Sequence, residues 1–165
     1  MARVDETLPL IPSLFDRLLD DEPHVSSESY KSQTQVLREM RNSVRRDLEH
    51  LLNTRIHWFG WPAHLEELET SLVNYGLPDF GSANMSSQDS RKRFSTHIEE
   101  TIKRFEPRFK TVSVTVLENS EQLDRTLRLR IDALLDVDPD PEPIVFDSIV
   151  EPVNCSLTVK ESRHD

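Results

Sequence analysis

Glycine and cysteine are scarce in this chain of 165 residues, and no long apolar run is present. The three glycines cannot build the glycine-rich loop that binds phosphate in nucleotide-binding folds. The single cysteine, Cys155, excludes an internal disulfide and a cysteine metal cluster. A membrane-spanning helix needs about 20 consecutive apolar residues, and the N-terminal segment has neither such a run nor a basic leader. We therefore expect a soluble, cytoplasmic protein without membrane insertion.

The net charge of −10 is distributed unevenly along the chain. Residues 61–90 contain five acidic and no basic side chains, and residues 1–30 contain seven acidic and two basic ones. By contrast, residues 31–60 carry six basic and three acidic side chains, and residues 91–110 carry seven and three. Such alternation indicates complementary charged contacts, within the fold or with partners. The acidic blocks would repel phosphates, so we do not expect nucleic-acid binding.

Two segments have the apolar period of an amphipathic helix. The first runs from about Ser29 to Asn53, and the second from about Ser87 to Phe105, where Pro107 ends it. The apolar residues that recur at spacings of three and four are Val36, Leu37, Met40, Val44, Leu48, Leu51 and Leu52 in the first segment, and Phe94, Ile98, Ile102 and Phe105 in the second.

From residue 111 the pattern changes to alternation of apolar and polar residues, which is typical of half-buried strands. Strands are expected at 111–116, 127–133, 144–146 and 153–159, the last with Cys155 in the core. The prolines of residues 136–143 exclude a strand interior there. Helices followed by strands predict an α+β fold, with the N-terminal helices packed on one face of a mostly antiparallel sheet of four to five strands.

The N-terminal residues 1–27 are expected to form an arm, and residues 28–165 a single domain. A short helix in the arm would place Leu14, Phe15 and Leu18 on one face. A helix this short is marginal alone and has to dock on something. It either covers the domain's own core or grips a neighbouring subunit, in which case Leu14, Phe15 and Arg17 would bind that partner.

A second apolar segment lies between the two long helices. Trp58 and Trp61 belong to a loop that either folds onto the core or serves as an exposed anchor for a partner. After this loop, a short helix is expected whose apolar residues are Leu65, Leu68, Leu72 and Val73.

The sequence Glu106-Pro107-Arg108 places an acid and a base around a fixed corner. Glu106 lies at the end of a helix, Pro107 forces the chain out of it, and Arg108 begins the first long strand. A fixed acid and base can form charge-assisted pairs with little ordering cost. We expect the corner to display both charges outward to another subunit. The alternative is that the two side chains pair locally and contribute little.

Arg128 and Arg130 share the strand face opposite the apolar residues. Together with Arg108 they could form a basic docking patch, or they could be a solvated outer face.

Catalytic and metal-binding patterns are weak. The carboxylate pairs Glu66/Glu67 and Glu99/Glu100 invite a glycosidase interpretation, but consecutive helical residues do not face each other. The three histidines at 50, 57 and 64 are separated by a loop, and no HExxH motif is present. We expect no enzymatic activity, no catalytic residues, no metal, no cofactor and no small-molecule substrate. A cell-wall glycosidase, which is lysozyme-like, remains the alternative.

Four segments in order along the chain resemble the TssE family of type VI secretion baseplate subunits, which is related to the phage baseplate wedge subunits historically called lysozyme-like. These segments are residues 12–23, PSLFDRLLDDEP; residues 44–55, VRRDLEHLLNTR; residues 74–80, NYGLPDF; and residues 105–109, FEPRF. The last contains the Glu-Pro-Arg motif of the family.

The resemblance implies a non-enzymatic structural subunit of a contractile injection machine. It implies a wedge with TssF and TssG, with TssK attached, and a link to the first ring of the sheath built from TssB and TssC, whose assembly the subunit would template. It also implies that Glu106, Pro107 and Arg108 form the essential contact site. Because the terminal sheet resembles the interlocking strands of the sheath subunits, addition of a strand at a sheet edge is a further implied docking mode.

Overall fold

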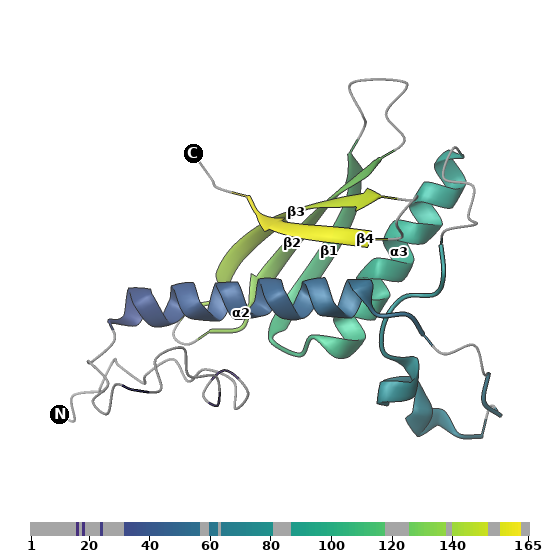
Figure 1. Ribbon diagram of the computed structural model, residues 1–165, viewed down its shortest axis with the longest axis horizontal. Helices are drawn as coiled ribbons and strands as arrows, with labels where there is room; N and C mark the ends of the chain where they lie inside the picture. The colour runs from purple at the N-terminus through teal and green to yellow at the C-terminus, as the bar shows by residue number, and fades with distance from the viewer. Residues whose placement is uncertain are drawn as a thin grey trace.

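The structure is a computed structural model, drawn in Figure 1. It describes residues 16, 18, 24, 32–56, 60–62, 64–80, 87–117, 126–137, 140–151 and 156–162. The expected strand residue Cys155 and most of the expected arm helix lie outside these residues, although Asp16 and Leu18 of the arm are described as helical.

The first long helix, α2, spans Gln33–Asn53. It begins a few residues later than the periodicity indicates because Ser32 forms a capping box with Gln35. The Gln35 amide donates to the Ser32 hydroxyl at 3.4 Å, and the Ser32 amide donates to the Gln35 side chain at 2.9 Å. This reciprocal pair satisfies two amides that the first turn of a helix leaves without partners.

The second helix, α3, spans Gln88–Phe105. Ser87 occupies the N-cap position, but its side chain makes no capping hydrogen bond. Asp89 in the first turn and Arg104 in the last turn complement the helix dipole. Glu106 immediately after the helix does not, so its carboxylate needs a compensating cation.

Four strands follow and form one sheet in the order β1-β2-β3-β4. They are β1 (Phe109–Leu117), β2 (Leu127–Leu135), β3 (Glu142–Glu151) and β4 (Ser156–Glu161). Every neighbouring pair is antiparallel. The strand β3 is longer than expected and includes Pro143 at its second position, opposite Leu134. Proline is tolerated this close to the start of a strand.

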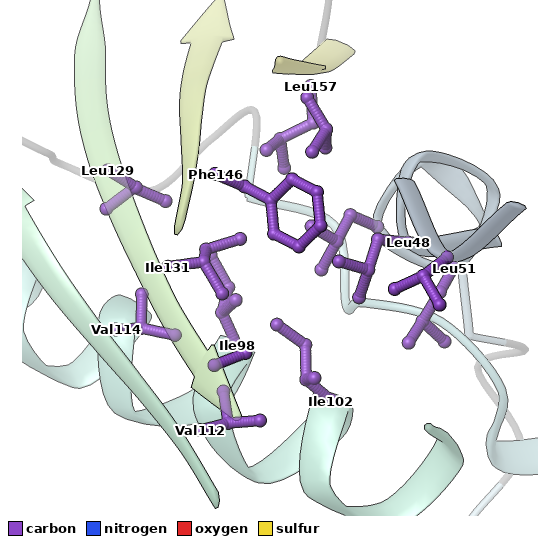
Figure 2. Close-up of a cluster of buried hydrophobic side chains, with 14 of the residues drawn as sticks. Leu48, Leu51, Ile98, Ile102, Val112, Val114, Leu129, Ile131, Phe146 and Leu157 are labelled. Atoms are coloured by element: carbon purple, nitrogen blue, oxygen red, sulfur yellow. The ribbon is translucent and has the colours of Figure 1, made fainter. Parts of the chain in front are cut away.

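Both helices pack on the same face of the sheet, which confirms the predicted α+β fold. In Figure 1, α2 crosses in front of the sheet and α3 lies to the right of it. The most extensive contacts between a helix and a strand are those of α2 with β4 and of α3 with β1. Figure 2 shows Phe146 at the centre of the core, between Leu48 of α2 and Ile131 of β2. All three of these side chains are fully buried.

The segment between the two long helices does not form the single short helix expected there. It forms two 3-10 turns, η1 (Glu66–Thr70) and η2 (Leu72–Asn74), with no buried residue in either. Leu72 is 86% exposed. Trp61 is half-buried, and Trp58 lies outside the described residues.

Among the helices that the structure describes, none is both long and apolar enough to cross a membrane.

Candidate docking site at the helix–strand corner

The corner between α3 and β1 is fixed by backbone hydrogen bonds on both sides of Pro107. The Glu106 amide donates to the Ile102 carbonyl at 2.8 Å and so closes the last helical turn. On the other side, the Arg108 carbonyl accepts from the Asp136 amide at 2.8 Å, which ties Arg108 to the end of β2. Pro107 itself is exposed. The corner therefore has little conformational freedom.

Glu106 and Arg108 pair with each other across Pro107. The Arg108 guanidinium donates from Nε to Glu106 Oε1 and from Nη2 to Glu106 Oε2, both at 2.6 Å. This two-bond fork is the strongest form of a charge-assisted hydrogen bond. The Glu106 side chain is only 6% exposed, and that of Arg108 is 24% exposed. The expectation that both charges are displayed outward is therefore wrong for Glu106, because its carboxylate is buried and satisfied within the domain.

A chain of ion pairs continues from Arg108 across the surface of α2. Arg108 Nη2 donates to Asp47 Oδ2 at 2.7 Å. Arg46 Nη2 contacts Asp47 Oδ1 at 3.1 Å and Asp16 Oδ1 at 2.8 Å. The Ser43 hydroxyl also donates to Asp16, at 2.6 Å. The cluster therefore links the N-terminal arm, α2 and the corner in one network.

A shallow hollow of about 390 Å³ adjoins this cluster. Its walls include the apolar side chains of Leu51 and Phe105 and the exposed Pro107, and its polar lining includes Asp47 and Arg108. Tyr75 also lines it and makes an edge-on contact with Phe105, with ring centroids 5.3 Å apart. An apolar hollow with a few fixed charges is suited to receiving a side chain of another protein.

The electrostatics of the site favour a permanently charged arginine. Burial alone would lower the pKa of Arg108, but the hydrogen bonds and charges of Glu106 and Asp47 outweigh it and raise that pKa above its usual range. Burial, followed by the negative charges of Asp47 and Glu106, raises the pKa of the Tyr75 phenol. The pKa of Arg46 is also raised, mainly by the hydrogen bond of its side chain with Asp16.

Arg128 and Arg130, which were also predicted to bind partners, are not brought to this site. Arg128 and Arg130 are exposed on the sheet face away from the helices. In the register of β1 and β2, Arg128 lies opposite Leu117, whereas Arg108 lies at the other end of the pair, beside Asp136. The three arginines therefore do not form one basic patch. Leu14, Phe15 and Arg17 lie outside the described residues.

Both free edges of the sheet are hydrogen-bonded by side chains of the helices. On β4, the side chain of Asn53 donates from Nδ2 to the Leu157 carbonyl at 2.7 Å and accepts at Oδ1 from the Leu157 backbone amide at 2.9 Å. On β1, the Glu99 carboxylate accepts from the Val114 amide at 3.1 Å. An incoming strand would have to displace these groups at Leu157 or Val114, and strand addition at a sheet edge stays a prediction.

Sequence reasoning identified Glu106, Pro107 and Arg108 but missed Asp47, Asp16 and Tyr75. All three missed residues lie inside the segments that carry the family resemblance. Their presence in those segments was the available signal, but nothing in the local pattern indicates that they meet. In the structure, the four segments each contribute to one network and its adjoining hollow.

Comparison with known protein families identifies the family to which the chain belongs. The family model for baseplate wedge protein gp25 matches residues 38–140, which is more than half of the chain. The protein therefore belongs to a class of structural subunits found in the baseplates of phages and other contractile injection machines. Within that class, the chain belongs to the baseplate wedge protein gp25 family, which includes TssE. Family membership implies contacts with other baseplate components. No curated protein and no solved structure matches the chain.

Proposed function

We propose that this chain is the gp25-family subunit of a type VI secretion baseplate, where it joins the wedge to the contractile sheath and templates sheath assembly. Its wedge partners would be TssF and TssG, with TssK attached, and its sheath partners TssB and TssC. The observation that carries the proposal is the convergence of all four TssE-like segments on the Glu106–Arg108 cluster and its hollow.

The geometry of the corner supports one docking mode. Glu106 and Asp47 hold the Arg108 guanidinium in place, so a partner bears little entropic cost in ordering it. Pro107 is exposed beside the hollow, whose apolar walls would accept a partner's side chain. In this arrangement Glu106 is a positioning residue, and Pro107 and Arg108 make the contact.

Sheath assembly in cells tests this proposal. Arg108→Lys keeps a cation next to Glu106 but loses the planar fork, so it should preserve folding and prevent assembly of fluorescently labelled sheath. The matched control is Arg104→Lys, an exposed residue on α3, which should leave assembly unchanged. Thermal melting of the purified variants checks folding. Normal sheaths in cells that carry Arg108→Lys would contradict the site assignment.

A second variant separates loss of docking from loss of stability. Pro107→Glu places a charge beside the hollow without removing either partner of the Glu106–Arg108 pair. We expect it to reduce co-purification with the sheath or wedge subunits while the chain remains folded. Unchanged co-purification with TssF, TssG and the sheath would argue against docking at this corner.

The rival function, a cell-wall glycosidase, has little support from its candidate carboxylates. Glu99 already accepts from Lys103 at 2.6 Å and from the Val114 amide at 3.1 Å. Glu66 and Glu67 are exposed on η1. We therefore propose that the chain is not an enzyme, and pure protein should release no fragments from peptidoglycan.

A further inference from the structure

The segment between Ile56 and Gly76 is an excursion whose two ends are joined by backbone hydrogen bonds. Ile56 donates to the Leu77 carbonyl at 3.0 Å, and the Leu77 amide donates to the Thr54 carbonyl at 2.9 Å. Gly76 has a positive φ of 113°, and a Cβ there would lie 2.4 Å from the Thr54 carbonyl oxygen. The excursion therefore leaves the domain from a tightly closed base.

The described tip of this excursion is stabilised by hydrogen bonds within it. Asn74 donates from its side chain to the Glu69 carbonyl at 2.9 Å, and Ser71 donates to the Leu68 carbonyl at 2.9 Å. The turns η1 and η2 pack mainly against each other. Figure 1 shows them standing apart from the helices and the sheet. A preformed tip needs little ordering when it binds.

Large apolar side chains are exposed on this tip. Among the described residues only four large hydrophobic side chains are exposed, and three of them are here: Leu72 at 86%, Val73 at 45% and Leu65 at 41%. Grouped exposure of this kind marks interaction sites more often than isolated exposed leucines do. These three residues would form the apolar centre of an interface.

Acidic side chains lie next to these apolar residues along the chain. Glu66, Glu67 and Glu69 are exposed on η1, and no ion pair within the described residues involves them. The sequence contains no lysine or arginine from residue 56 to residue 90. The negative charge of the tip is therefore not offset locally, and it selects for a positively charged partner surface.

We propose that residues Leu65–Asn74 form a second docking surface, which binds an apolar depression rimmed by lysine and arginine on a different protein subunit. A second copy of this chain does not offer such a surface at its apolar hollow, because the carboxylates of Asp47 and Glu106 line that hollow together with Arg108 and outnumber its positive charge. This surface is separate from the Glu106–Arg108 site and does not depend on it.

Site-specific photo-crosslinking of the full chain tests this surface. Benzoylphenylalanine at position 72, in cells that express the assembled machine, should crosslink to one non-identical protein through a peptide of net positive charge. The same probe at Thr158, exposed on the outer face of the sheet, should not give that product. Crosslinking to a second copy, to lipid, to an acidic peptide, or at no more than the Thr158 level would overturn the proposal.

Charge reversal provides the matched test. With the probe retained at position 72, Glu66→Lys, Glu67→Lys and Glu69→Lys together should lower the crosslink yield by about tenfold or more. The control reverses three exposed acids elsewhere, Glu100, Asp132 and Asp140, and changes the net charge by the same amount. Neither set should change the melting temperature much, since all six acidic residues are exposed. Equal yields from the two sets would show that the acidic rim does not select the partner. Because sheath formation is not the readout, failure here is distinguishable from failure of the docking corner.

Discussion

The side chain of Glu106 is buried more deeply than that of its partner Arg108, at 6% exposure against 24%. The pair is therefore asymmetric. Removing the arginine leaves a buried carboxylate without its cation, whereas removing the glutamate leaves an arginine that still bonds Asp47. Truncating one partner of a buried pair is usually costly because the other charge is stranded.

We predict that Arg108→Ala destabilises the domain by about 3 kcal/mol. Glu106→Gln should cost less, about 1–2 kcal/mol, because a neutral acceptor remains for the guanidinium. The double variant Glu106→Ala, Arg108→Ala should be more stable than Arg108→Ala alone. Urea unfolding of the wild type, Glu106→Ala, Arg108→Ala and the double variant measures this coupling in a double-mutant cycle. Additive losses would show that the two residues act independently.

Asn53 is predicted to protect the β4 edge of the sheet. Asn53→Asp keeps an acceptor for the Leu157 amide but turns an oxygen toward the Leu157 carbonyl, so the edge should open. We expect a loss of about 1–2 kcal/mol and faster hydrogen exchange at the Leu157 amide. An exposed edge should also increase self-association. Asn42→Ala, at an exposed position on the same helix, is the control and should change neither property.

Glu99 should make the domain sensitive to acid. The hydrogen bond from Lys103, followed by that from the Val114 amide, lowers the pKa of Glu99. Since the folded pKa lies below the unfolded value of about 4.3, this stabilisation is present above that pH and is lost as the pH falls through the folded pKa. Glu99→Gln should therefore lose stability at pH 6 and little at pH 3. Exposed Glu100→Gln serves as the control, and a pH-independent effect of Glu99→Gln would refute the linkage.

Two glycines give a matched test of the closed base of the excursion. Gly76→Ala forces a side chain into a positive-φ position and against the Thr54 carbonyl, so it should cost about 1–3 kcal/mol or more. Nothing lies within 4 Å of a Cβ added at Gly60, so Gly60→Ala should change stability by less than about 0.5 kcal/mol. Chemical denaturation measures both. Equal losses of stability from the two substitutions would mean that a side chain at position 76 does not strain the base of the excursion.

Local periodicity alone predicted the two long helices and the four strands. The residues of α2 and α3 that recur every three or four positions are those that face the core, as Leu48 and Ile98 illustrate. The alternation in β2 likewise separates a buried face from an exposed face. These predictions succeed because burial of one face imposes the period of each element on its own sequence. The predicted helix at residues 65–73 is instead two 3-10 turns, and of its four apolar residues Leu65, Leu72 and Val73 are exposed.

The sequence by itself determined the α+β class, the faces of the long elements and the rigid corner at Pro107. Only the tertiary structure decided that Glu106 is buried, that Asp47 shares Arg108 with it, and that Asn53 covers the edge of β4. The physical reason is distance along the chain: Asp47 and Arg108 are 61 residues apart, and Asn53 and Leu157 are 104 apart. Pairing over such separations depends on how a helix docks on the sheet, which no local pattern of residues encodes.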